Sequence, residues 1–423
     1  MNLALSEEQI MIRDAAAEVL AERSATAAVR HAIEHSAGRD ESLWRMLAGE
    51  LGWCALGVPE AVGGAGLGAT ELVLLMEQMG RRLACVPYFG TVCLAATALA
   101  QCNTDPANAW LARIAGGDAC ATLALATGAD FDANELPVRA VETSQGYRLT
   151  GLLEQVFDGA SADLLLVPAL IESADKSITP AHTVALFELE PHARGLVCTP
   201  LVTLDATRPL ARLELHGVDI ARSALRATGR NAEQLLSRTA WFAALALAAE
   251  QLGGAQQCLD LTLAYTADRV QFGRTIASFQ AVKHRCAQMM VDIEATRSAV
   301  LGAAHAWDDA GCASDVPPAE VLADIATAKA TANEAFRFCA QEAIQLHGGV
   351  GFTWEYDPQL YFKRAQASSA QFGSTSQLLS RLAAQVIDSR APLAATAVKS
   401  VLKPSLDATL DTAQAAVQFA GVA

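Results

Sequence analysis

Two segments in the last third of the chain combine residue types that can hold an anionic ligand. One reads YTADRVQFGRTIASFQAVKHR over residues 265–285, and the other reads AIQLHGGVGFTWEYDPQLYFKRA over residues 343–365. A phosphate group can be bound by one arginine together with backbone N–H donors, and Arg269 offers the guanidinium. The glycines of GGVG would let the backbone approach such a ligand closely. Each feature also has a simpler interpretation: LHGGVGF as a helix C-cap and turn, and Arg269 as a surface ion pair with Asp268.

A single acidic residue, Glu250, interrupts the apolar run WFAALALAAEQLGGA. An ionisable group in such surroundings lies either at a functional cleft, where it could act as a base, or in an ion pair with an arginine at an interface. His284 and His347 are weaker candidates for a base, because a histidine between a helix and a glycine turn usually makes a structural hydrogen bond. No spacing of histidine and acidic residues indicates a metal site.

The elements that must position these residues follow the order helical, β, helical. Ser6 is a plausible N-cap for a first helix, and a further helix is expected at 70–84. Six short β-branched segments follow between about 119 and 220, and long helical patterns cover 233–267, 276–309, 317–346 and 375–390. The pattern predicts an α+β protein. Its expected parts are an N-terminal helical domain at 1–118, a middle β-barrel or sandwich at 119–232, a C-terminal helical bundle at 233–390 and a helical tail at 391–423.

Composition narrows the classes of partner. The net charge of −15 argues against binding to nucleic acid or to an anionic membrane surface. None of the ten cysteines has C-x-x-C spacing, so free thiols in a reducing cytoplasm are expected. Neither a signal peptide nor an apolar run of membrane-spanning length is evident.

The order of the segments RVQFG…FQ and QLHGGVGF, together with LGVPEAVGGAGLG near the N-terminus, resembles the acyl-CoA dehydrogenase family. The resemblance covers nearly the whole chain to about residue 390. It implies a flavoprotein oligomer, with FAD between the β domain and the C-terminal helices and with contacts from a facing subunit. It also implies an acyl-CoA substrate and an acceptor similar to electron-transfer flavoprotein. The residues that it assigns to FAD are Arg269, Gln271, Phe272, Gln345, Gly348, Gly349, Thr375 and Gln377.

The reaction that this resemblance implies is α,β-dehydrogenation of an acyl thioester, in which a carboxylate removes the α-proton and the flavin takes the β-hydrogen as hydride. The usual position of that carboxylate, just before a Gly-Thr-Ser-Gln-like run, falls on Gly373. A second position used in the family falls near Ala243 and Ala244, so both are empty. Glu250 is therefore the first candidate for the base, and Glu355 is a weaker one.

The β domain departs from the family pattern. LATGADFDANELP stands where a Thr-Glu-Pro…Gly-Ser-Asp run is common, with Thr127 and Gly128 as remaining hydrogen-bonding groups, and the run from Gly151 to Phe157 replaces Gly-x-Lys-x-Trp-Ile. Three hypotheses fit these gaps: a dehydrogenase for a bulky or branched acyl group, a non-catalytic partner subunit of a heteromeric dehydrogenase, or a flavin oxidase or monooxygenase on the same fold.

Overall fold

The computed structural model describes residues 4–125, 133–172, 182–311 and 317–388. The chain as far as Leu379 forms one compact unit, and a second unit begins at Ser380. The description below concerns the first unit, together with the described residues of the helix that runs on past Leu379. The expected tail at 391–423 and the candidate residues Thr127 and Gly128 lie outside the described residues.

The N-terminal part is helical, as predicted. Its α-helices are α1 (Glu7–Arg23), α2 (Thr26–His35), α3 (Glu41–Arg45), α4 (Ala69–Arg82), α5 (Thr97–Cys102) and α6 (Asp105–Ala115). Ser6 caps α1, because its side chain accepts from the backbone N–H of Gln9 at 3.1 Å while the Gln9 side chain accepts from the Ser6 N–H at 3.0 Å. The π-helix η4 (Phe89–Ala96) follows α4 and is fully buried.

The β part is one sheet of eight strands in the order β6-β7-β3-β2-β4-β5-β8, with β1 paired to β4 outside this path. The six predicted segments each contain a strand, and β2 and β8 are additional. The strands are β1 (Ala121–Leu123), β2 (Arg139–Glu142), β3 (Gly146–Phe157), β4 (Leu164–Glu172), β5 (His182–Leu189), β6 (Leu196–Pro200), β7 (Leu210–Ala221) and β8 (Leu225–Thr228). The pairings of β1 and β2 with β4 are parallel and the others are antiparallel.

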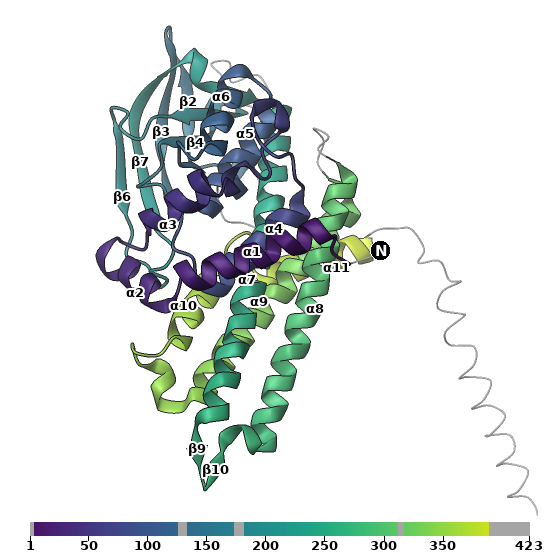
Figure 1. Ribbon diagram of the computed structural model, residues 1–423. Coiled ribbons are helices and arrows are strands. Elements are labelled where there is room, and N and C mark those ends of the chain that lie inside the picture. The colour runs from purple at the N-terminus through teal and green to yellow at the C-terminus, as the bar shows by residue number, and fades with distance from the viewer. Residues whose placement is uncertain (1–3, 126–132, 173–181, 312–316, 389–423) are drawn as a thin grey trace, which may run out of the picture. The chain divides into compact units, whose positions relative to one another are not determined.

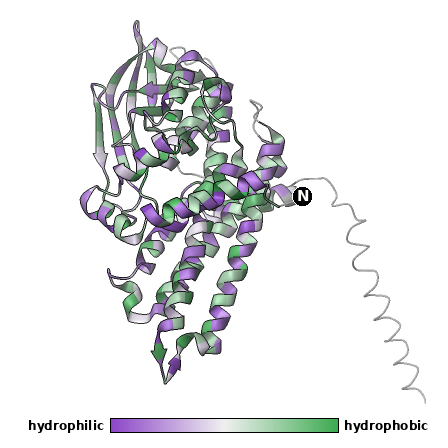
Figure 2. Ribbon diagram, viewed as in Figure 1, coloured by the Kyte–Doolittle hydropathy of each residue, from purple (hydrophilic) through white to green (hydrophobic). Residues whose placement is uncertain are grey.

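The C-terminal part is a bundle of long helices. It consists of α7 (Arg230–Asp268), α8 (Gln280–Ala310), α9 (Ala319–His347), α10 (Pro358–Ser368) and α11 (Thr375–Asp388), with the two-stranded hairpin β9 (Val270–Gln271) and β10 (Arg274–Thr275) after α7. Figure 1 shows α7 and α8 running side by side down to this hairpin. Figure 2 shows hydrophobic and hydrophilic residues mixed along their lower halves, which is typical of helices that are covered on one side.

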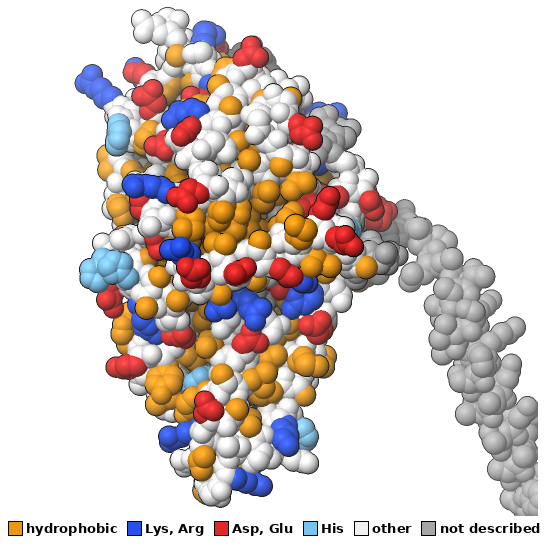
Figure 3. All heavy atoms as spheres, viewed as in Figure 1, with side chains coloured by type: hydrophobic (Ala, Val, Ile, Leu, Met, Phe, Trp, Pro, Cys, Tyr) orange, Lys and Arg blue, Asp and Glu red, His pale blue; other side chains and the backbone are white. Residues whose placement is uncertain are grey.

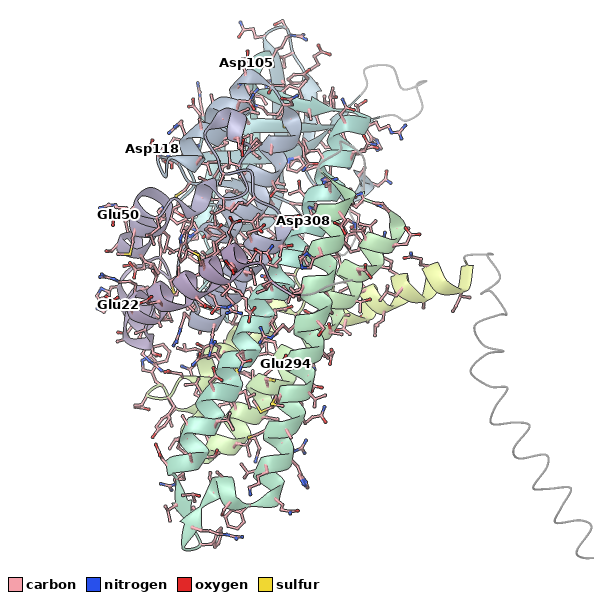
Figure 4. The ribbon with its side chains drawn as sticks, turned by 45° about the vertical axis from the view of Figure 1, so that its right-hand side comes forward. Glu22, Glu50, Asp105, Asp118, Glu294 and Asp308 are labelled. Atoms are coloured by element: carbon pink, nitrogen blue, oxygen red, sulfur yellow. The ribbon has the colours of Figure 1, made fainter. Side chains whose placement is uncertain are left out.

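Helix α4 fastens the N-terminal part to the bundle. Gly80 of α4 and Gly253 of α7 meet at a close crossing, where a Cβ on Gly80 would lie 1.9 Å from the Glu250 carbonyl oxygen and one on Gly253 would lie 1.8 Å from that of Glu77. From α8, Asp308 accepts hydrogen bonds from the first two backbone N–H groups of α4, at 2.6 and 3.0 Å, so it caps that helix (Figure 4). Among the described residues, no helix is both long and apolar enough to cross a membrane.

Candidate flavin contacts and active site

The hairpin after α7 presents three of the predicted site residues to solvent. Arg269, Gln271 and Phe272 are all exposed, and the Phe272 side chain is 92% accessible. Phe272 has a positive φ of 53° and Gly273 one of 78°, so the chain turns sharply between β9 and β10. Figure 3 shows basic and hydrophobic side chains gathered at the lower end of the visible face, where Figure 1 places this hairpin. An exposed aromatic ring on a two-stranded tip is poised to contact another molecule.

Three further predicted residues lie at the end of α9. The helix ends at His347, and Gly348 follows with a φ of 64° at the start of the 3-10 turn η8 (Gly348–Phe352). Gln345, Gly348 and Gly349 are exposed, and a Cβ on either glycine would meet nothing within 4 Å. The backbone of this turn is therefore open to a ligand from outside the chain.

Aromatic stacking brings the ends of α7 and α9 together. The Tyr265 ring stacks on the His347 ring with centroids 4.3 Å apart. Tyr265 lies one helical turn before Arg269, and His347 directly precedes Gly348, so the structure gathers six of the eight predicted contact residues at one end of the bundle. We call Arg269, Gln271, Phe272, Gln345, Gly348 and Gly349 the bundle-end group. Its exposed guanidinium and open glycine backbone fit a pyrophosphate.

His347 itself has a structural role. Its Nδ1 lies 2.6 Å from the Ala343 carbonyl oxygen and therefore donates to it. Burial lowers the pKa of His347. His284 is exposed on α8, and Glu355 is exposed on the loop after η8.

Thr375 and Gln377 lie elsewhere. The Thr375 hydroxyl donates to Glu334 at 2.8 Å, and Glu334 precedes His347 by 13 residues on α9, which is about 20 Å of helix. The Gln377 side chain accepts from the backbone N–H and the hydroxyl of Ser374, at 3.0 and 2.9 Å. These two residues therefore stand apart from the bundle-end group.

Gly373, at the usual position of the base, lies beside a cluster of three buried phenylalanines. Phe372 has a positive φ of 52°, and its ring stacks on that of Phe157 with centroids 6.1 Å apart and planes inclined by 19°. Phe89 lies edge-on to both, at 5.8 Å from Phe372 and 5.0 Å from Phe157. We call Phe89, Phe157 and Phe372 the aromatic cluster. The run 151–157, which departs from the family pattern, thus ends against the position where the base is missing.

Glu250 lies in a buried ion-pair network. One carboxylate oxygen accepts from Arg208 and the other from Arg364, while Arg364 also binds Asp205. Glu250, Arg364 and Asp205 have side chains no more than 4% exposed. Burial alone would raise the pKa of Glu250, but the charges and hydrogen bonds of the two arginines hold it below its ordinary value.

The role of Glu250 as a base stays a prediction, and the geometry favours the other interpretation of this residue, an ion pair with arginine. The partners belong to the same chain rather than to a subunit interface. Ala243 and Ala244 are buried on α7, seven and six residues before Glu250.

Asp158 is a buried carboxylate that no pattern in the sequence indicates. It follows Phe157 at the end of β3, adopts a φ of 54°, and is 7% exposed. Burial raises its pKa to about 7, against the lowering effect of Arg208, Arg39 and Arg364 and of a hydrogen bond from the Gly90 N–H. In the sequence, VFDGA resembles a strand end and turn, where an aspartate is ordinary. No local signal reveals its burial.

Lys329 of α9 is hydrogen-bonded to the residues that hold the loop at Gly373. Its ammonium donates to the side chains of Asn333 and Gln251 and, at 3.3 Å, to the Ser368 carbonyl oxygen, and Asn333 in turn donates to the Gly373 carbonyl oxygen at 3.1 Å. Burial lowers the pKa of Lys329 to about 7. These bonds fix the backbone of Gly373 without placing a carboxylate there.

Comparison with known proteins agrees with this architecture. The model of the acyl-CoA dehydrogenase C-terminal domain matches residues 235–387, and that of the N-terminal domain matches residues 6–118. The chain is 34% identical over 388 residues to the acyl-CoA dehydrogenase IpdE2 of Mycobacterium tuberculosis, covering 90% of this chain and 98% of that protein. It is also 34% identical over 355 residues to the acyl-CoA dehydrogenase FadE27 of the same organism, covering 83% of this chain and 90% of that protein.

Two of the similar solved structures carry the names of two proteins each. The ChsE4–ChsE5 complex from Mycobacterium tuberculosis matches with a TM-score of 0.80 at 28% identity, covering 92% of this chain and all of the matched chain. A variant of the Tcur3481–Tcur3483 steroid acyl-CoA dehydrogenase matches with a TM-score of 0.77 at 30% identity, covering 90% of this chain and 98% of the matched chain. With its helical, β and helical parts and this extent of identity, the chain belongs to the acyl-CoA dehydrogenase family.

Proposed function

We propose that this chain is one subunit of a heteromeric, FAD-dependent acyl-CoA dehydrogenase, and that a related partner subunit supplies the catalytic base. The assembly would remove the α- and β-hydrogens of an acyl-CoA whose acyl group is bulky, of the steroid type. The observation that carries the proposal is the state of the Gly373 region: the base position has no carboxylate, and the aromatic cluster packs beside it.

Two buried carboxylates of this part of the fold, Glu250 and Asp158, are poorly suited to take a proton from a substrate. A general base needs a free lone pair within hydrogen-bond reach of the proton. Both oxygens of Glu250 are engaged by arginines, which also lower its pKa. The pKa of Asp158 is suitable, but its carboxylate is 7% exposed, behind Phe157.

The spacing of the aromatic cluster also argues against a flavin ring between its members. A planar ring inserted between two parallel rings needs about 7 Å between their centroids, because aromatic carbons pack at about 3.5 Å. Phe157 and Phe372 are 6.1 Å apart and nearly parallel. The cluster therefore fits a closed interior better than a cofactor cleft.

The bundle-end group fits a different role: it can contact a cofactor that another subunit holds. Members of the family bind FAD, and one similar structure contains FADH2. Bound FAD would supply the hydride acceptor. Arg269 would neutralise charge on the pyrophosphate, and Gly349 would offer a backbone N–H donor to it. The lack of a Cβ on Gly348 and Gly349 would let the ligand approach the chain closely. Thr375 and Gln377 would contact the adenosine end, as the family resemblance implies.

The comparisons support a heteromer and a steroid-type substrate. Of the similar structures, one is a complex of two different chains and another is named as a steroid dehydrogenase of two components. Those properties belong to the relatives, and their transfer to this chain is part of the proposal.

The test is to purify the chain alone and together with related subunits that carry the missing glutamate. Absorption spectra report bound flavin, and anaerobic addition of a panel of acyl-CoAs reports its reduction. We expect flavin and bleaching in the co-purified complex only, with bulky acyl-CoAs bleaching it best. A flavin-bearing single chain that acyl-CoA bleaches would contradict the proposal and would favour Glu250 as the base. Oxygen consumption without an added acceptor would instead favour an oxidase.

A further inference from the structure

We infer that Arg30 and Asp357 are positioning residues for the glycine turn at Gly348–Phe352, and that they hold it in the conformation that receives the cofactor pyrophosphate. The inference rests on the proposed function, since it concerns how the bundle-end group is kept in place. Helix α2 supplies the fastening, although it lies more than 300 residues away in the sequence.

Asp357 occupies the N-cap position of α10, yet its side chain makes no capping hydrogen bond to that helix. Both of its oxygens are taken by α2 instead. Arg30 donates to Oδ1 at 3.0 Å and Thr26 donates to Oδ2 at 2.6 Å. An aspartate at an N-cap normally accepts from its own helix, so this arrangement gives up a local bond for a long-range one.

Arg30 also holds the loop between the turn and Asp357. It donates to the Tyr356 carbonyl oxygen at 3.1 Å, and its guanidinium carbon lies 4.8 Å from the centre of the Trp354 ring. Trp354 in turn donates to Glu34 of α2 at 3.3 Å. Three residues of this loop, Trp354, Tyr356 and Asp357, are thus bound to α2.

The fastening passes to the glycine turn through Tyr356. The Tyr356 ring packs edge-on against Tyr265 at 6.1 Å and against His347 at 6.3 Å. His347 directly precedes Gly348, so the loop held by Arg30 and the helix end that starts the turn are in ring contact.

The first part of the turn is open, whereas Gly351 is buried against α9. Gly348 and Gly349 have open space around their Cα atoms, and Phe352 is 71% exposed. Its conformation therefore depends on what holds its two ends. Arg30 Nη1 is buried without a hydrogen-bond partner among the described residues, so the arginine is kept here at a desolvation cost. Preordering a binding turn is a role that would justify this cost.

The experiment measures FAD affinity by fluorescence titration in the co-expressed complex, for Arg30→Gln, for Asp357→Asn and for the charge exchange Arg30→Asp with Asp357→Arg. We expect each single variant to weaken FAD binding by about tenfold, because the cofactor must then order the turn itself. The rate of flavin reduction at saturating FAD should stay unchanged. The exchange should recover only the part of the affinity that the Arg30–Asp357 ion pair carries, because it restores neither the bond to the Tyr356 carbonyl oxygen nor the bond from Thr26.

Two controls separate the possible failures. Arg212→Gln removes a surface pair with Glu154 on the sheet and should leave FAD affinity unchanged. Arg269→Gln removes a direct contact and should weaken FAD binding. If Arg269→Gln weakens binding and Arg30→Gln does not, the positioning role is wrong and the proposed function stands. If neither variant weakens binding, the bundle-end group does not serve the flavin and both fail. A weakening of FAD binding in Arg30→Gln that only accompanies an equal loss of thermal stability would also overturn the positioning role.

Discussion

Replacing Glu250 by glutamine separates its two interpretations, the catalytic base and the buried ion pair. Glutamine has nearly the same shape, so no cavity forms. The change removes the negative charge and turns one of the two accepting oxygens into an NH2 donor that faces an arginine. In the wild-type network, Glu250 and Asp205 balance Arg208 and Arg364. The variant leaves one positive charge uncompensated in a site where Glu250 and Arg364 are each 3% exposed.

Removing one partner of a buried ion pair costs about 3–5 kcal/mol, because the remaining charge stays desolvated. We expect a loss of this size in the free energy of unfolding of Glu250→Gln, measured by urea denaturation at neutral pH. Glu154→Gln is the matched control, since Glu154 pairs with Arg212 on the sheet surface and their side chains are 60% and 44% exposed. Its expected loss is about 1 kcal/mol.

The pH dependence gives a second check. Because the folded-state pKa of Glu250 lies below its ordinary value of 4.5, its contribution to stability is present above about that pH. The contribution is lost as the pH falls through the lower, folded-state pKa. The difference between wild type and Glu250→Gln should therefore be constant near neutral pH and narrow in acid. A variant as stable as wild type that no longer supports flavin reduction in the complex would refute the ion-pair interpretation.

Two further outcomes follow from buried groups elsewhere in the fold. Asp158→Asn keeps a residue type that tolerates positive φ and removes an acid whose pKa burial raises from 3.8 to about 7. Because the folded protein holds this proton more tightly than the unfolded chain, the stability of the wild type should fall as the pH rises from about 4 to about 7. The variant should therefore be more stable than wild type at pH 8, by up to about 4 kcal/mol. A difference between the two proteins that does not vary with pH in urea denaturation would contradict this. Gly253→Ala places a methyl group 1.8 Å from the Glu77 carbonyl oxygen and should cost about 3 kcal/mol, whereas Gly49→Ala, which meets nothing within 4 Å, should change the melting temperature little. Equal melting temperatures for the two alanine variants would show that the crossing of α4 and α7 is not close.

Local patterns in the sequence were enough to predict most of the elements. The cap at Ser6, the strand segments and the long helices depend on neighbouring residues, and the structure has them close to the expected bounds. The parallel pairing of β1 and β2 with β4 was not predictable, because register depends on partners distant in the sequence. The strands β2 and β8 were also not predicted. Each is only four residues long, so its local pattern is weak, and its place in the sheet depends on partners distant in the sequence.

The candidate site divides in the same way. Arg269 and the glycine turn could be found because each sits in a contiguous, family-specific segment. The sequence left two possibilities for Glu250, a functional cleft or an ion pair with arginine. It could not choose between them, because the partners Arg364 and Arg208 are 114 and 42 residues away. The burial of Asp158 and the bond from Arg30 to Asp357, 327 residues apart, depend entirely on tertiary packing.

The most direct test of the central claim is the FAD content of the purified protein, alone and in complex with a glutamate-bearing relative. We expect a colourless chain when it is expressed alone. In the complex we expect one FAD for every two chains, which a bulky acyl-CoA reduces under anaerobic conditions. One FAD per chain in the protein purified alone, reduced by an acyl-CoA, would contradict this claim, since neither the missing carboxylate nor the aromatic cluster would then prevent catalysis.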